Sequence, residues 1–142
     1  MAEILLGSHV GMSGKEMFLG SVKEAESYGA NVLMVYTGAP QNTRRKEIGE
    51  LRIDEGISYA EKAGIREIVI HAPYIINLGN MEKPEMFDFG VEFLAKEVKR
   101  AAAFHSKVLV LHPGSSLSAG VEASVEQIAK GLNPVSYTHL RA

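Results

Sequence analysis

The chain has 142 residues, of which 46% are hydrophobic and 23% are charged, a composition that excludes a disordered or collagen-like chain and indicates one globular domain at most. Its 15 Lys and Arg residues against 17 Asp and Glu residues give a net charge of −2, which excludes a tail-type DNA binder that depends on overall positive charge. The absence of cysteine excludes disulfides, iron–sulfur clusters, thiolate zinc sites and cysteine nucleophiles, so any metal must be bound through nitrogen and oxygen.

Four short apolar runs predict strands. Each run is continuously apolar, which is typical of strands in a parallel sheet that is buried on both faces. The runs are residues 4–6, 32–36, 68–70 and 108–111. None approaches the roughly 20 apolar residues of a membrane span, and Met1-Ala2-Glu3 carries no basic leader, so we expect a cytoplasmic protein without membrane contact.

Four amphipathic helices are predicted, one after each strand. Their apolar stripes share helical spacing: Phe18, Val22, Ala25 and Gly29; Ile53, Ile57, Ala60 and Gly64; Phe87, Val91, Leu94 and Val98; Val121, Val125, Ile128 and Leu132.

Local signals indicate where these helices begin and end. The segment 13–16 has the pattern of a capping box, and Pro84 suits a first helical turn. Gly29 and Gly64 suit helix ends, and Pro134 is expected to end the last helix.

The βαβαβαβα order predicts an α/β fold, either an open doubly wound sheet or a barrel. A closed TIM (β/α)8 barrel takes about 250 residues, so the chain would cover about the first four βα units of one. Residues 134–142 lose the helical stripe and look like translated read-through sequence. We therefore expect native barrel sequence over 1–133 and a non-native or disordered tail over 134–142.

Three of the five histidines follow strand ends: His9, His71 and His112. The carboxyl ends of parallel strands share one edge, and neighbouring strands lie about 4.8 Å apart, so His71 and His112 could bind one ion. One such histidine is more typical of a structural group, but three together favour a metal or catalytic site. His105 lies at the opposite end and His139 in the tail. No Asp or Glu directly follows strand one, three or four, so the sequence identifies no carboxylate ligand.

Two loops beside these histidines suit a polyanion. Residues 37–46 place Gln41 and Asn42 before Arg44, Arg45 and Lys46, which suits phosphate contact; a solvated helix start is the alternative. Residues 73–80 offer Tyr74 and Ile75 beside His71, either as wedges between bases or as a roof over the barrel mouth. No nucleotide-binding or serine-hydrolase motif is present.

These motifs together resemble the N-terminal half of the endonuclease IV family. The resemblance is carried by the segments 7–10, 36–45, 71–79 and 111–115. It implies a TIM barrel with three zinc ions at its mouth, which hydrolyses the phosphodiester 5′ to an abasic site in double-stranded DNA during base-excision repair. It also implies roles for single residues: His71 and His112 as ligands of one zinc ion, His9 as a supporting residue, and Gln41, Asn42, Arg44, Tyr74 and Ile75 as DNA contacts.

The remaining zinc ligands of the family, including a bridging glutamate, fall beyond residue 142, so the chain as given is expected to be inactive. The whole protein is expected to be a monomer, whereas the open edges of a half barrel are expected to self-associate. A sugar isomerase or epimerase with one divalent metal, and a module that binds DNA or a partner without cutting it, are the alternatives. A small sugar needs neither the basic loop nor an exposed Tyr74.

Overall fold

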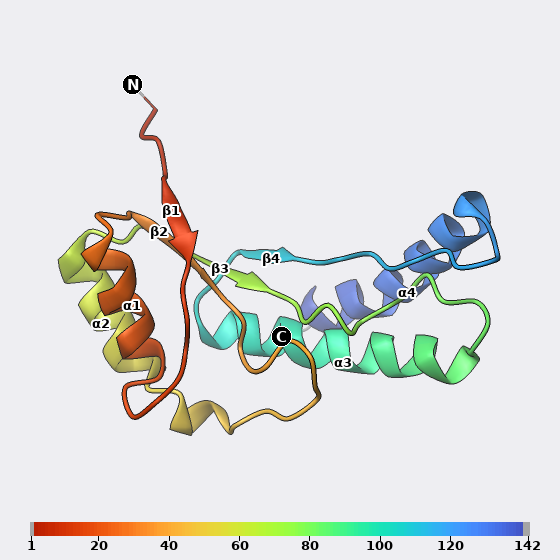
Figure 1. Ribbon diagram of the computed structural model, residues 1–142, viewed down its shortest axis with the longest axis horizontal. Helices are drawn as coiled ribbons and strands as arrows, with labels where there is room; N and C mark the ends of the chain where they lie inside the picture. Colours follow the sequence, from red (N-terminus) through yellow and green to blue (C-terminus); the bar gives the residue numbers. More distant parts are fainter. Residues whose placement is uncertain (1, 141–142) are drawn as a thin grey trace.

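The computed structural model describes residues 2–140, with side chains as far as residue 136. Strands and helices alternate along the chain (Figure 1). The strands are β1 (Gly7–His9), β2 (Val32–Val35), β3 (Glu67–His71) and β4 (Val108–Val110). The helices are α1 (Phe18–Ser27), α2 (Ile53–Ala63), α3 (Pro84–Ala103) and α4 (Val121–Leu140), with a short 3-10 helix at Ile48–Glu50.

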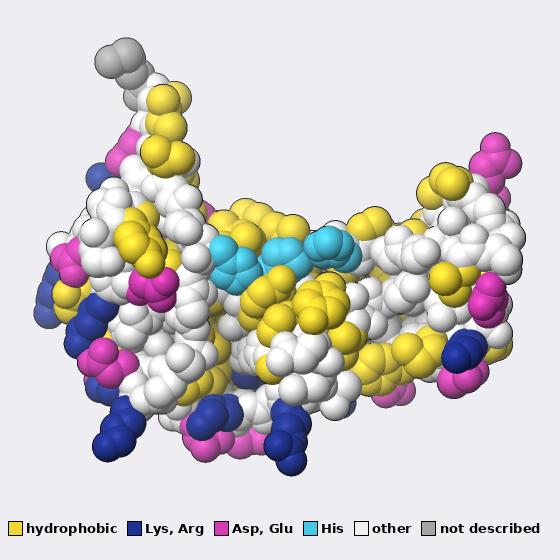
Figure 2. Space-filling model, in the orientation of Figure 1, with side chains coloured by type: hydrophobic (Ala, Val, Ile, Leu, Met, Phe, Trp, Pro, Cys, Tyr) yellow, Lys and Arg dark blue, Asp and Glu magenta, His cyan; other side chains and the backbone are white. Residues whose placement is uncertain are grey.

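The four strands form one parallel sheet in sequential order, β1-β2-β3-β4. A doubly wound sheet reverses its strand order at a switch point, so the sequential order leaves the barrel as the remaining alternative. The α1–α2 pair and the α3–α4 pair pack along the sheet, and the molecule is hollowed on one side between the N-terminal segment and α4 (Figures 1 and 2). The predicted partial barrel of four βα units is confirmed.

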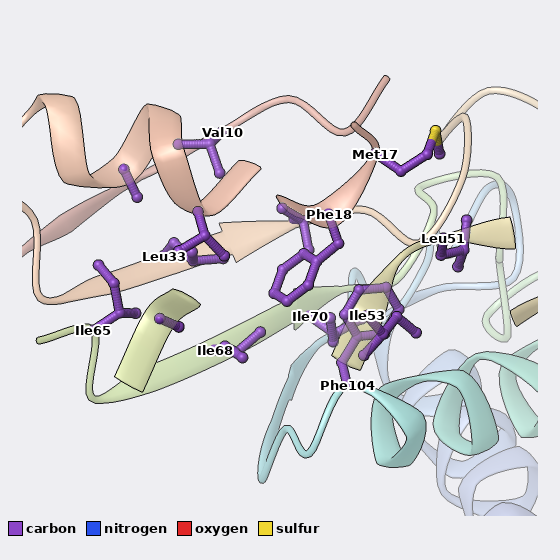
Figure 3. Packing of buried hydrophobic residues seen from close by; sticks show 14 of the residues in the cluster. Val10, Met17, Phe18, Leu33, Leu51, Ile53, Ile65, Ile68, Ile70 and Phe104 are labelled. Carbon is purple, nitrogen blue, oxygen red and sulfur yellow. The ribbon is translucent and has the colours of Figure 1, made fainter. Parts of the chain in front are cut away.

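The larger core cluster lies between α1, α2 and the central strands (Figure 3). Phe18 of α1 is fully buried and meets Phe104 edge to face, with 4.8 Å between ring centroids. A Cβ at Gly56 would overlap the Phe18 ring, so the glycine lets α2 approach α1 closely. A second cluster joins the loop after β3 to α3 and α4 through Ile76, Leu78, Phe93, Leu94 and Val135.

The structure corrects three predictions about strands and helix starts. The first strand is Gly7–His9 and not residues 4–6, because the Leu6 N–H donates to the Asn31 side-chain oxygen and not to a neighbouring strand. β2 and β3 alternate in burial, since helices cover only one face of the sheet, and β1 and β4 are largely exposed. No side chain caps α1; its Phe18 N–H donates to the Leu51 carbonyl instead. Pro84 in the first turn of α3 and Gly64 at the end of α2 are as predicted.

The last helix also differs from its prediction. Val121 and Val125 are 72% and 58% exposed, so the first part of the predicted apolar stripe faces solvent, whereas Ile128 of the same stripe packs against the second core cluster. The helix continues through Pro134 to Leu140. An interior proline costs a helix about 3 kcal/mol, and burial of Val135 offsets part of that cost by about 1.5–3 kcal/mol. Residues 141–142 lie outside the described residues, and the non-native origin of 134–142 stays a prediction.

Between residues 2 and 140, no helix combines the length and the apolar character that crossing a bilayer requires.

Candidate metal and nucleic-acid site

One aromatic side chain from the end of each strand contributes to a continuous row. The ring centroids of His9 and Tyr36 are 4.7 Å apart, those of Tyr36 and His71 are 4.8 Å apart, and those of His71 and His112 are 5.4 Å apart. Figure 2 shows a band of histidine side chains on one face of the molecule. The row follows from the parallel register, which brings the carboxyl ends of β1 to β4 to one edge.

The backbone fixes the tautomer of His71. Its Nδ1 lies 2.7 Å from the Ala72 carbonyl oxygen, and a carbonyl only accepts hydrogen bonds, so Nδ1 carries the proton. In this tautomer the lone pair lies on Nε2, as in metal-ligating histidines whose other nitrogen donates to a carbonyl. Burial, followed by repulsion from His71, lowers the pKa of His9 below the ordinary 6.5.

His71 and His112 offer two imidazoles to one ion. A zinc site in a protein takes at least three protein ligands. In the part of the chain that the structure describes, no group of three or more His, Asp or Glu side chains lies in ligating arrangement. The residues present therefore fit part of a zinc site and do not complete one.

Asn77 ties the loops after β3 and β4 together. Its side-chain oxygen accepts the N–H groups of Gly79 and Ser115, both at 3.0 Å. Gly114 has φ +125°, and a Cβ there would overlap that oxygen. Asn77 therefore holds the segments that follow His71 and His112 at a fixed separation. The sequence reasoning missed it, although Asn77-Leu78-Gly79 has the pattern of an Asx-turn.

α4 also fastens the loop after β3. Ser124 Oγ donates to the Gly79 carbonyl at 3.1 Å, and Gln127 Nε2 donates to the Asn80 carbonyl at 2.6 Å. In this fastened loop Tyr74 is 52% exposed, whereas Ile75 is partly buried against the second core cluster. The Tyr74 side chain can therefore contact a ligand, whereas part of the Ile75 side chain packs in the core.

The loop after β2 borders a cavity of about 1130 Å³ beside the histidine row. His9, Tyr36, Asn42, Arg44 and Lys46 contribute to its lining. Gln41 is exposed but does not line it. The Asn42 side-chain oxygen accepts the Arg44 N–H at 2.9 Å, so this amide shapes the loop.

The three adjacent cations of this loop differ in exposure, which the sequence did not predict. Arg44 and Lys46 are exposed, but the Arg45 side chain is only 11% exposed and its Nε lies 2.7 Å from Glu97 Oε1. The pairing was missed because Glu97 lies 52 residues along the chain. The sequence did contain a signal of a buried carboxylate, because Glu97 falls on the apolar stripe of α3 beside Phe93 and Leu94.

Comparison with known proteins assigns this arrangement to a fold family. The family described as "Xylose isomerase-like TIM barrel" matches residues 22–139. "Probable endonuclease 4" of Lachnoclostridium phytofermentans is 62% identical over 130 residues, which are 92% of this chain and 43% of that protein. The chain thus spans less than half the length of the curated relatives it matches.

Solved structures agree on the fold. The crystal structure of endonuclease IV from Thermus thermophilus superposes with a TM-score of 0.73 at 27% identity, covering 92% of this chain and 48% of that one. L-ribulose 3-epimerase superposes with a TM-score of 0.68 at 11% identity, covering 96% and 47%. The second likeness concerns the fold alone.

Proposed function

The chain belongs to the family of xylose isomerase-like TIM barrels, and on that basis we propose that it is the N-terminal part of a zinc-dependent endonuclease that cuts DNA at abasic sites. Its similarity to proteins named probable endonuclease 4 supports this choice within the family. The proposed reaction is hydrolysis of the phosphodiester 5′ to the abasic site in double-stranded DNA. Because the relatives are bacterial proteins, the enzyme is proposed to act in the cytoplasm.

One observation carries the proposal: the paired imidazoles of His71 and His112 lie in the row of rings at the strand ends, and an exposed Arg44 lines the cavity beside that row. A zinc ion bound at the imidazoles would supply an activated water and stabilise charge on the phosphate. His71 and His112 would hold one ion, and the family resemblance implies three in the whole protein. Arg44 would contact the DNA, and Tyr74 would fill the space left by the missing base.

The epimerase alternative has weaker support. Its solved relatives share the fold at identities of 10–19%, whereas the endonuclease relatives reach 62%. The exposed arginine loop also has no use in binding a small neutral sugar.

Binding to an abasic duplex tests the proposal. We expect the chain to bind a duplex with a tetrahydrofuran abasic analogue more tightly than the intact duplex in fluorescence anisotropy. Arg44→Gln is expected to weaken that binding about tenfold, within the usual range for a groove-contacting arginine. The duplex should stay uncut, because the described residues supply two zinc ligands and not a full set.

Arg66→Gln is the matched control for this charge change, because Arg66 is 63% exposed and precedes β3 at the opposite end of the sheet. Equal losses of affinity in Arg44→Gln and Arg66→Gln would refute the assignment of Arg44. Absence of any preference for the abasic duplex would refute the proposed substrate.

Self-association of the 142-residue chain is expected as well, although the whole enzyme is proposed to be a monomer. β1 and β4 are the outer strands of the sheet, and no other strand within residues 2–140 pairs with their free edges. Exposed Leu6, Val108 and Val110 lie at these edges. Unpaired strand edges promote association. Sedimentation velocity should therefore show dimers or larger species, and a stable monomer at micromolar concentration would contradict the prediction.

A further inference from the structure

We propose that Arg45 and Glu97 are positioning residues. Together they form a clamp, an ion pair that binds the backbone of the loop of residues 37–46 to α3, so that Arg44 is held on a rigid backbone where DNA would bind. The consequence for DNA binding rests on the proposed function. The ordering of the loop does not.

The Arg45 guanidinium gathers the loop around itself. Its Nη1 lies 3.1 Å from the Ala39 carbonyl oxygen, 3.1 Å from that of Asn42 and 2.7 Å from that of Arg44. Its Nε donates to Glu97 at 2.7 Å, and the guanidinium lies over the Phe93 ring at 4.8 Å from the centroid. One side chain thus links three points of the loop backbone to α3.

The same face of α3 also fixes both ends of the loop. Arg100 donates to the Thr37 carbonyl through Nη2 and to the Lys46 carbonyl through Nη1, both at 2.9 Å. Thr37 Oγ1 donates to the second carboxylate oxygen of Glu97 at 2.7 Å and accepts from Arg100 Nε at 3.0 Å. Glu97 therefore connects the start of the loop to its Arg45 clamp.

Burial makes this arrangement specific. Glu97 is fully buried, so its carboxylate depends on Arg45 and Thr37 for the hydrogen bonds that water would otherwise make. Gly38 provides the space: a Cβ there would lie 2.7 Å from Arg45 Cδ and 2.9 Å from Nη1. An alanine at position 38 would push Arg45 out of place without changing the charge of the cluster.

Arg44 itself shows what the clamp achieves. Its N–H is bonded to the Asn42 side chain and its carbonyl to Arg45, so both of its backbone groups are fixed. Its side chain makes no hydrogen bond or ion pair with the described residues. A fixed backbone under an uncommitted side chain lowers the entropy cost of binding, as in other preorganised sites.

The first test measures loop order without DNA. Arg45→Lys keeps the positive charge opposite Glu97, but an ammonium group cannot bind Glu97 and the three loop carbonyls at the same time. Gly38→Ala displaces the Arg45 side chain by steric overlap. Hydrogen–deuterium exchange of the amides of residues 38–46 should become about tenfold faster in both variants, because opening the loop no longer requires breaking the clamp. Arg66→Lys, the same exchange at an exposed site, should leave these rates unchanged. Unchanged exchange in both Arg45→Lys and Gly38→Ala would overturn the proposal.

The second test is a double-mutant cycle on abasic-duplex affinity. Arg45→Lys should weaken binding about fivefold in the parent chain and not at all in the Arg44→Gln background, because coupled residues are non-additive. Additive losses would overturn positioning, since Arg45 would then act independently of Arg44. If Arg44→Gln alone leaves affinity unchanged, the proposed function fails at this residue, while the exchange rates still decide whether the clamp orders the loop.

Discussion

Replacing His112 by alanine is expected to weaken binding of Zn²⁺ to the chain about 100-fold, and His71→Ala is expected to do the same. Loss of a group that only orients a metal ligand costs 10–100-fold in affinity, so loss of a ligand should reach at least the upper end of that range. The reason is geometric: the two rings are 5.4 Å apart, and the Nδ1–H of His71 is bonded so that Nε2 is left to coordinate. Isothermal titration of the metal-free chain at pH 7.5 measures the effect.

His105→Ala is the matched control for the zinc titration. His105 is exposed and lies between α3 and β4, at the end of the sheet opposite the histidine row. An equal loss in His105→Ala would show that zinc binds histidines at random and would contradict the site.

The sheet and the histidine row could be predicted because both depend on short-range patterns. The runs at 32–36 and 68–70 correspond to β2 and β3, and parallel strands bring their carboxyl ends to one edge whatever the rest of the chain does. His71 and His112 could therefore be placed together without any knowledge of loops. Their role as zinc ligands stays a prediction.

The structure differs from the sequence predictions where the burial of a residue depends on segments far away in the sequence. Val121 and Val125 have helical spacing, yet the face of α4 that packs against α3 and the loop after β3 is the one with Ser124 and Val135. Periodicity shows that a helix has an apolar face but not whether a neighbour covers it.

Arg44 and Arg45 show the same limit at the candidate site. They are identical in type and adjacent in sequence, and only the approach of α3 distinguishes them. Arg45 forms a buried ion pair with Glu97 of α3, whereas Arg44 stays exposed. Sequence reasoning could locate the basic loop but could not divide its arginines between structure and binding.

Replacing Glu97 by alanine is expected to lower the free energy of unfolding by about 3–5 kcal/mol, the usual cost of removing one partner from a buried ion pair. The variant would leave the largely buried Arg45 without a counter-charge and Thr37 Oγ1 without its acceptor. Urea denaturation followed by circular dichroism measures the change.

Glu16→Ala is the control that separates the effect of burial from the effect of ion-pair distance on stability. Glu16 and Lys23 pair at 2.6 Å, as closely as Arg45 and Glu97 at 2.7 Å, but their side chains are 47% and 42% exposed. Water screens an exposed pair, so its loss should cost less than about 1 kcal/mol. The N···O distances of the two ion pairs are nearly equal. A several-fold larger loss of unfolding free energy in Glu97→Ala would therefore come from burial and from the hydrogen bonds between Glu97 and the loop. Similar losses in the two variants would mean that water reaches Glu97 and that the ion pair does not hold the loop.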